Sequence, residues 1–454
     1  MITNRRTFLG LAAAAVTIPL AGCAPGGSAP AASSAPTDVN TDPASLPETT
    51  ITTLDTWTDK ASMQSQWVTA VNAAFTAKYP KLKVKRTSAT FDDINKTLKL
   101  KLSDTSAPDV VPANNGWQGI GTFAKAGLIL NLDAYAKGYG WDKRIPATIA
   151  TMHQVAADGS QIGTGSWFGA PIAQGGFITV YFNRSKLEKL GLATPTTFDE
   201  FTASLSKAKA AGEVPMMIGT QDQWLSTTTL FALMNVFAEK QKIADFVYGT
   251  GGAATDIGMK EAGALYQQLA ADSYLPKNFA GTPGSDSGQA FVEGTGVYYF
   301  YYSDSLPFNN VATANKFGTF LLPTEGMPLQ ATGASNQNFS IATKSKSPDA
   351  AAAYLDFASS TEAGDIALKT GVMPFNGTFT KPADAGALLA DELAELNAVQ
   401  ETDGFVPYFD WASPTMLDTL GAQTQLLLAG KITPDQLVEA CQKDYDAFRK
   451  SQGK

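Results

Sequence analysis

The sequence predicts an α/β protein whose folded part is divided into two lobes. Three observations lead to this prediction. The chain has 454 residues, its hydrophobic fraction is 44%, and short apolar strands alternate with amphipathic helices from about residue 51 onward. This length is typical of two or three domains, and the hydrophobic fraction is large enough for more than one core. Alternation of strands and helices favours sheets that are covered by helices.

The first alternation lies between residues 51 and 112. Strands are expected over residues 51–57, 82–87 and 109–112, and a helix over residues 92–104. Another helix is predicted by apolar residues that recur at every fourth position before Pro80: Trp67, Val71, Phe75 and Tyr79. This βαβαβ order predicts a parallel sheet.

The alternation continues in the rest of the chain. Strands are expected over residues 177–183, 214–219, 296–302 and 317–323, and helices over 197–212, 225–238, 347–360 and 433–448. Two of these helices should begin with a capping box, formed by Thr197 with Glu200 and by Thr433 with Gln436. Cys441 shares the apolar face of the last helix, so we expect a buried packing thiol.

The N-terminal segment is typical of an export signal. Arg5 and Arg6 precede an apolar stretch of signal-peptide length, and LAGC at residues 20–23 resembles a bacterial lipobox. Residues 1–22 are therefore predicted to be a signal peptide with a lipobox, after which Cys23 is acylated. RRTFLG also resembles a twin-arginine signal, which leaves the export route open. Residues 24–50 are rich in Ala, Pro and Ser, so residues 23–50 should be the acylated Cys and a disordered tether.

The composition disfavours several functional classes. The net charge of −8 gives no support to nucleic-acid binding. With one histidine, His153, and two cysteines, the chain cannot build the usual zinc site of four nitrogen or sulfur ligands, and a Ser-His-Asp or Cys-His site would depend on His153 alone. No phosphate-binding GxxxxGK[ST] loop occurs. We expect no metal, no cofactor and no nucleic-acid partner.

Five segments spread over most of the chain are the most informative for recognising a family. They are SAPDVV with FAKAGLILNLDAYA, FGAPIAQGGFITVYFNRSKLEKLGLATPTTFDEF, AFVEGTGVYYFYYSDSL, FSIATKSKSPDAAAAYLDFASS and LLLAGKITPDQLVEACQKDYDAF. In this order, and together with the lipobox, they resemble the extracellular solute-binding proteins of ABC importers, in particular the carbohydrate-binding group that includes maltose-binding protein. The chain departs from that group at residues 298–302, where it has five consecutive aromatics.

The resemblance implies a two-lobe periplasmic-binding-protein-like fold, with a ligand cleft between the lobes and hinge crossovers. By matching segments, residues 51–173 plus 335–402 would form lobe 1, and residues 174–334 plus 403–454 would form lobe 2. The crossovers would lie near residues 173–176, 332–338 and 402–406. Four glycines there suit either segments that rotate when the cleft closes or ordinary turns: Gly175, Gly176, Gly333 and Gly404.

A sugar site needs polar side chains for the hydroxyls and aromatic rings for the C–H faces, close together at the carboxyl ends of strands. Several predicted loops combine the two types. The candidate ligand-binding residues are Trp57, Asp59, Asn115, Trp117, Gln174, Gln221, Asp222, Trp224, Tyr301, Tyr302, Asp304, Asn336, Asp410 and Trp411. Alternation along the aromatic strand would place residues 298, 300 and 302 on one face and residues 299 and 301 on the other, and does not decide which set is buried.

The resemblance implies a substrate-binding component of an ABC transporter. It would capture a sugar, expected to be an oligosaccharide, without chemistry, and deliver it to transmembrane permease subunits. We expect a monomer that is extracytoplasmic and lipid-anchored to the cell membrane. Two alternatives stay open. One is the same fold binding a non-sugar solute such as a polyamine or a peptide. The other is a secreted glycan-active enzyme, which would need two carboxylates at a set separation.

Overall fold

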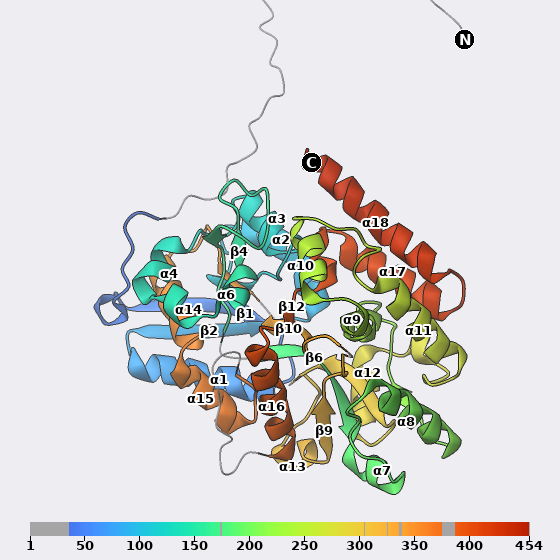
Figure 1. Cartoon of the computed structure of the whole chain (residues 1–454). Coiled ribbons are helices and arrows are strands. Elements are labelled where there is room, and N and C mark those ends of the chain that lie inside the picture. Colours follow the sequence, from blue (N-terminus) through green and yellow to red (C-terminus); the bar gives the residue numbers. More distant parts are fainter. Residues whose placement is uncertain are drawn as a thin grey trace, which may run out of the picture.

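The computed structural model describes residues 36–172, 175–303, 305–324, 326–335, 338–374 and 386–453. Figure 1 shows two regions, each built around its own sheet with helices packed on the outside. The predicted α/β class and the division into two lobes are therefore confirmed. The candidate residues Gln174, Asp304 and Asn336, and the predicted acylation site Cys23, lie outside the described residues.

The first sheet has the strand order β11-β3-β1-β2. Strand β1 (Thr49–Asp55) pairs in parallel with β2 (Leu82–Ser88) and with β3 (Val110–Pro112), as the βαβαβ pattern predicted. Strand β11 (Phe339–Ile341) adds to β3 in the antiparallel sense. The first lobe is therefore completed by a segment that returns from the second half of the chain.

The other elements of the first lobe surround this sheet (Figure 1). They are η1 (Pro43–Ser45), α1 (Met63–Lys78), α2 (Phe91–Ser103), α3 (Ile120–Lys125), α4 (Asp133–Tyr139), α5 (Trp141–Arg144), α6 (Ala147–Thr151), the paired strands β4 (Gln154–Val155) and β5 (Ser166–Trp167), α14 (Pro348–Ala358) and α15 (Thr361–Thr370).

The second sheet has the order β12-β10-β6-β8-β7, and β9 also pairs with β6. The strands are β6 (Gly175–Asn183), β7 (Met216–Met217), β8 (Tyr298–Tyr302), β9 (Phe317–Phe320), β10 (Ala331–Ser335) and β12 (Phe405–Val406). Strand β6 pairs in the antiparallel sense with β8, β9 and β10. This sheet is therefore mixed, whereas helix–strand alternation alone favoured parallel pairing.

Helices of the second lobe enclose this sheet and form the right-hand part of Figure 1. They are α7 (Arg184–Lys189), α8 (Phe198–Ala210), α9 (Leu225–Phe237), α10 (Lys240–Tyr248), α11 (Met259–Ala271), η2 (Phe279–Gly281), α12 (Gly284–Val292), α13 (Val311–Ala314), α16 (Ala387–Glu401), η3 (Phe409–Ala412), α17 (Met416–Leu428) and α18 (Pro434–Ser451). Both predicted capping boxes are present, at the starts of α8 and α18, and Cys441 is fully buried.

Helix α16 lies in a different place from the one expected. The sequence analysis assigned residues 335–402 to lobe 1, but α16 packs against β9 of the second sheet, as Figure 1 shows. Arg184 forms an ion pair with Asp391 of this helix, and Thr179 of β6 is hydrogen-bonded to Glu395. The helix faces the second sheet with polar side chains that find partners there, a feature that its apolar pattern does not reveal.

The three predicted crossovers lie side by side in one sheet. The start of β6 pairs with β10, where Gly333 is opposite Phe177, and β10 in turn pairs with β12, where Thr332 is opposite Val406. The chain segments near residues 175, 333 and 405 thus form one short stack of neighbouring strands. A change in the angle between the lobes would act on all three strands together.

Gly333 has no room for a side chain in this stack. Its φ is +123°, and a Cβ added there would lie 2.6 Å from both the Gly176 carbonyl oxygen and Phe177 Cα. We expect Gly333→Ala to destabilise the protein by about 2 kcal/mol or more, because backbone strain adds to the clash. Urea unfolding measures this effect. Gly251→Ala is the matched control, because a Cβ at Gly251 meets no atom within 4 Å. Equal midpoints for the two variants would contradict the prediction.

Among the described residues, no helix combines the length and the apolar character that are needed to cross a bilayer.

Candidate functional site

A cavity of about 360 Å³ lies between the two lobes. The first lobe contributes the loop that follows β1 and the starts of α1 and α2, and the second lobe contributes the end of β8, the start of α9 and η3. Of the eleven candidate ligand-binding residues that the structure describes, seven line this cavity: Trp57, Asp59, Trp224, Tyr301, Tyr302, Asp410 and Trp411. Both lobes therefore supply aromatic and carboxylate side chains to one space.

Aromatic rings form much of the cavity wall. Besides five of the residues above, Phe91 and Tyr408 belong to the lining. Five of the rings follow one another with centroid separations of 6.0, 6.4, 5.9 and 5.1 Å, in the order Phe91, Trp224, Tyr302, Tyr408 and Trp411. This row starts on the first lobe and continues over the second. It offers an extended apolar surface with phenol hydroxyls at intervals, which suits the C–H faces of a sugar.

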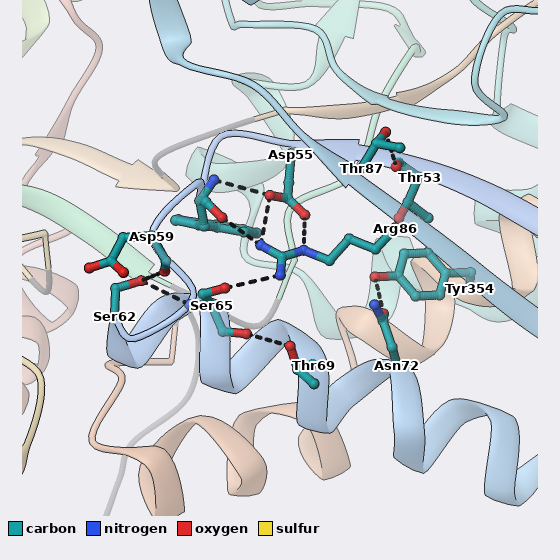
Figure 2. A network of polar contacts seen from close by, with 11 residues as sticks. Thr53, Asp55, Asp59, Ser62, Ser65, Thr69, Asn72, Arg86, Thr87 and Tyr354 are labelled. Carbon is teal, nitrogen blue, oxygen red and sulfur yellow. Dashed lines mark hydrogen bonds and ion pairs between the residues drawn. The ribbon is translucent and has the colours of Figure 1, made fainter.

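Figure 2 shows a polar network around Asp55, Ser65 and Arg86, and this network also holds the backbone of Trp57. Its backbone N–H donates to Asp55 Oδ1 over 3.0 Å, and its carbonyl accepts from Arg86 Nη2 over 2.7 Å. The Arg86 guanidinium also forms a two-point ion pair with Asp55, at 2.5 and 3.0 Å, and reaches Ser65 Oγ at 3.0 Å. Because the Asp55 side chain is 4% exposed, this pair is largely desolvated. The network fixes the loop that presents the Trp57 ring to the cavity.

Arg86→Lys tests whether this network positions the Trp57 loop for ligand binding. Lysine keeps the positive charge beside Asp55, but it cannot supply the fork of donors that reaches Asp55, Ser65 and the Trp57 carbonyl together. We expect a stability loss of about 1–2 kcal/mol together with weaker ligand binding. Thermal unfolding and titration calorimetry measure the two effects. Arg184→Lys removes a more exposed guanidinium that donates to Asp391 and to the Phe317 carbonyl, so it should lower stability without changing binding. Unchanged affinity in Arg86→Lys would rule out this positioning role.

Trp224 precedes α9 in a strained turn. Gln223 has φ +50°, and the hydroxyls of Ser226 and Thr227 donate to the carbonyls of Gln223 and Trp224 over 2.6 Å. The Trp224 ring is half-buried and lies between Phe91 and Tyr302. The turn therefore brings the indole from the start of α9 to the middle of the aromatic row.

The five aromatics of β8 have two different environments. Tyr298 and Tyr299 are buried with Phe300, and their hydroxyls are hydrogen-bonded to Ser204 and Ser287. Both faces of the strand are therefore packed at its start. Tyr301 and Tyr302 at its end are only half-buried, and both line the cavity. Alternation along the strand did not predict which face is buried. In the structure, burial depends on the position along β8, because both faces are buried at its start and half-buried at its end.

Asp410 and Trp411 lie in η3, where the two lobes meet. The Trp411 carbonyl accepts from the Trp117 N–H over 3.0 Å, and Asp410 Oδ2 accepts from Gln118 Nε2 over 2.7 Å. Gly116 packs so closely on Trp411 that a Cβ would lie 2.2 Å from Trp411 Cβ. Burial raises the pKa of Asp410 to about 6, which the hydrogen bond from Gln118 partly opposes.

Four of the described candidates are not among the lining residues. Asn115 is fully buried and donates to the Met152 carbonyl over 2.8 Å, whereas its neighbour Asn114 lines the cavity. Trp117 packs edge-on against Phe448 at 4.9 Å. Asp222 accepts a hydrogen bond from the Gly284 N–H over 2.6 Å, which connects the turn of Asp222 to the start of α12. Gln221 is exposed. In each case the right loop was identified, but a neighbouring residue reaches the cavity.

Two lining residues that the sequence analysis did not select carry buried polar atoms. Gln64 is 5% exposed and Tyr408 is 6% exposed, and neither Gln64 Nε2 nor Tyr408 Oη has a hydrogen-bond partner among the described residues. Gln64 lies at the start of α1 and Tyr408 just before η3, so they approach from opposite lobes. Buried polar groups normally have partners, so both atoms are candidates for contact with a ligand.

The described residues give little support to a metal or nucleophile site. Within these ranges no three His, Cys, Asp or Glu side chains are grouped so that they could hold a metal ion. His153 is fully buried, its Nδ1 lies 2.7 Å from Asn338 Oδ1, and its Nε2 has no partner among the described residues. Burial lowers the pKa of His153 to about 4, so the ring is neutral at pH 7. The contact of Nδ1 with an amide is typical of a packing role.

Known proteins provide sequence relatives with partial coverage. A segment of 106 residues is 35% identical to the "Probable sugar-binding periplasmic protein" of Mesorhizobium japonicum and covers 23% of each chain. Over 281 residues the chain is 25% identical to the "Multiple sugar-binding protein" of Streptococcus mutans, covering 60% of this chain and 63% of the relative. The chain thus aligns with less than two thirds of the length of these curated relatives.

Solved structures share the fold over nearly their whole length. A "Chitin oligosaccharide binding protein" has a TM-score of 0.73 at 21% identity, covering 89% of this chain and 99% of that one. The GacH receptor of Streptomyces glaucescens, solved unliganded and with acarbose, has a TM-score of 0.68 at 19% identity, with coverages of 89% and 98%. These TM-scores show a common fold.

The match to a protein family is more extensive than the matches to curated relatives. The model described as "Bacterial extracellular solute-binding protein" matches residues 57–365, which include the loop of Trp57, the turn of Trp224 and the aromatic strand β8. This is more than half of the chain, and it agrees with the two-lobe fold and the cavity between the lobes. The chain belongs to the family of bacterial extracellular solute-binding proteins.

Proposed function

We propose that this protein is the sugar-binding component of an ABC importer, and that it captures its ligand in the cavity between the lobes. The observation that carries the proposal is the lining itself. A row of aromatic rings lies beside hydrogen-bonding side chains from both lobes. Ligand contact with both lobes stabilises their closed arrangement by differential affinity. The sugar-binding names of the partial sequence relatives support the same ligand class.

The proposed ligand contacts are the seven lining residues that were selected from the sequence. The rings of Trp57, Trp224, Tyr301, Tyr302 and Trp411 would stack on sugar C–H faces, and Asp59 and Asp410 would accept hydrogen bonds from hydroxyls. The volume of about 360 Å³ is sufficient for a ligand larger than one hexose, which supports an oligosaccharide.

The proposed setting is the outer side of the cell membrane. The LAGC segment and the Ala-, Pro- and Ser-rich residues 24–50 support a lipid anchor at Cys23 followed by a tether. The loaded protein would deliver its sugar to transmembrane permease subunits, and the function requires no chemistry on the sugar. A Cys23→Ser variant that still fractionates with membranes would contradict the anchor.

Thermal unfolding of the purified protein with a panel of mono- and oligosaccharides tests the proposed function. A ligand that binds only the folded state raises the midpoint, with a stabilisation of about 2.7 kcal/mol at a hundredfold excess over the dissociation constant. We expect a shift with one structurally related set of sugars, which are recovered unchanged. A shift only with spermidine or with short peptides would show that the ligand is not a sugar. Hydrolysis of a bound glycan would show that the protein is an enzyme.

A further inference from the structure

The charge of the cavity lining restricts the ligand further, on the assumption that this cavity is the sugar site. Asp59 belongs to the loop after β1, and Asp410 belongs to η3 on the other lobe. No lysine, arginine or histidine occurs among the described residues that line the cavity. A ligand held there meets two carboxylates from opposite lobes and no described cationic side chain.

Neither carboxylate has a cationic partner in this part of the molecule. None of the ion pairs formed by described residues includes Asp59 or Asp410. The Arg86 guanidinium lies under the Trp57 loop, but its donors already serve Asp55, Ser65 and the Trp57 carbonyl. Asp410 is 6% exposed, and a carboxylate buried this deeply is strongly stabilised by a cation beside it.

Further charged residues are sequence neighbours of lining residues. Asp92 follows the lining residue Phe91, Asp418 follows the lining residue Leu417, and Lys60 follows the lining residue Asp59. Burial raises the pKa of Asp92, Lys96 opposes this shift, and the negative charges of Asp222, Asp93 and Asp418 add to it. Carboxylates of the two lobes are therefore close enough to repel one another near Asp92.

The rest of the lining suits a saccharide that carries a positive charge. Aromatic faces attract cations as well as sugar C–H groups. Gln64 Nε2 and Tyr408 Oη are buried and have no partner within the described part of the chain. Together with the side chains of Asn114 and Thr227 they provide hydrogen bonds for several hydroxyls, and a simple polyamine has no hydroxyls. We propose that the cavity binds a saccharide bearing a protonated amine more tightly than its neutral counterpart, and that it rejects uronates and sugar phosphates.

Matched sugars test this selectivity by titration calorimetry on the whole protein at pH 7.0, where most of the glucosamine and galactosamine is protonated and most of Asp410 is ionised. The sets are glucose, glucosamine and glucuronate, and galactose, galactosamine and galacturonate, each as the monosaccharide and as a linked trimer. We expect the amine form to bind at least tenfold more tightly than the neutral form, and no binding of the uronate. Neutral sugars that bind as well as the amines, or uronates that bind as well as neutral sugars, would overturn the inference while the proposed function stands. No binding in any set would overturn the inference, and the panel of the thermal unfolding test would then decide on the proposed function.

Two carboxylate variants locate the effect. We expect Asp410→Asn to reduce the ratio of amine to neutral affinity at least tenfold. Asp59→Asn should reduce the same ratio by a smaller factor, since Asp59 is exposed, and it supplies a second measurement if the buried variant folds poorly. Asp142→Asn, on the surface of α5, removes the same charge away from the cavity and should leave the ratio unchanged. An equal effect of Asp142→Asn would show that net charge alone is responsible.

The pH dependence gives an independent readout. The groups that face Asp410 are the neutral Gln118 amide and the phenols of Tyr302 and Tyr408, whose pKa values are raised well above the ordinary range by burial and by the charge of Asp410. Lowering the pH through about 6 therefore protonates Asp410 and leaves these neighbours neutral. We expect the ratio of amine to neutral affinity to fall over this range in the native protein and to stay flat in Asp410→Asn. A flat ratio in both would contradict the role of Asp410.

Discussion

Trp224→Ala is expected to weaken sugar binding by about 30-fold or more, which corresponds to about 2 kcal/mol. The Trp224 ring stands in the middle of the aromatic row, 6.0 Å from Phe91 and 6.4 Å from Tyr302. Its removal takes away a stacking surface and also separates the first-lobe ring from the second-lobe rings. Titration calorimetry with the sugar that gives the largest thermal shift measures the loss.

A second aromatic variant separates binding from folding. Phe237→Ala also truncates an aromatic residue of α9, but Phe237 is 40% exposed and does not line the cavity. We expect Phe237→Ala to change the melting temperature only slightly and to bind the sugar with the affinity of the native protein. Because Trp224 is only half-buried, its removal should lower the melting temperature modestly too. Comparable affinities for Trp224→Ala and Phe237→Ala would mean that the ligand does not use the aromatic row.

The fold was predictable where local patterns coincide with packing. The helix that ends before Pro80, both capping boxes and the parallel pairing of β1 with β2 and β3 follow from periodicity and short-range hydrogen bonding. The position of α16 was not predictable in this way. Glu392 and Glu395 of this helix are hydrogen-bonded to Tyr181 and Thr179 of β6, more than two hundred positions away, and no local pattern encodes such pairs.

The candidate site was predictable at the level of loops, but less so for single residues. Loops at strand ends that combine aromatics with amides or carboxylates do converge on one cavity. Within the loop NNGW, however, Asn115 turns into the core and Asn114 reaches the cavity, because the Asn115 amide is needed by the Met152 carbonyl. Tyr408 lies two and three positions before the selected residues Asp410 and Trp411. The aromatic and acidic residues of PYFDW, which led to the selection of Asp410 and Trp411, could also have identified Tyr408.

A protonated Glu395 gives the hydrogen bonds of α16 one donor for each contact. Thr179 Oγ1 lies 2.7 Å from Glu395 Oε2 and 3.1 Å from the Phe320 carbonyl. The hydroxyl has a single proton, and a carbonyl can only accept. With an ionised Glu395 this proton is shared between two acceptors, whereas a protonated Glu395 donates to Thr179 and leaves the Thr179 proton for the Phe320 carbonyl. Burial raises the pKa of Glu395 to about 8, and the charges of Glu392 and Asp391 add to this effect, which agrees with the geometry.

Glu395→Gln should therefore change how stability depends on pH. In the unfolded chain the carboxyl ionises near its ordinary pKa of 4.5, whereas the folded protein keeps the proton up to about pH 8. Folding thus retains a proton that the unfolded state has released, and the native protein loses stability as the pH rises through this range. Between pH 6.5 and 8 we expect a loss of about 2 kcal/mol relative to Glu395→Gln, at about 1.4 kcal/mol per pH unit.

The pH range and the controls make this result specific to Glu395. His153 and Asp410 titrate in the same way in the native protein and in Glu395→Gln, so the difference between the two stability profiles isolates Glu395. Glutamine keeps a donor for Thr179 without the charge, and Glu401→Gln changes an exposed residue at the end of the same helix. Urea unfolding at half-unit pH intervals should give a flatter profile for Glu395→Gln only. Parallel profiles for the native protein and Glu395→Gln would mean that Glu395 is ionised when folded, so that the carboxylate and the Phe320 carbonyl share the single proton of the Thr179 hydroxyl.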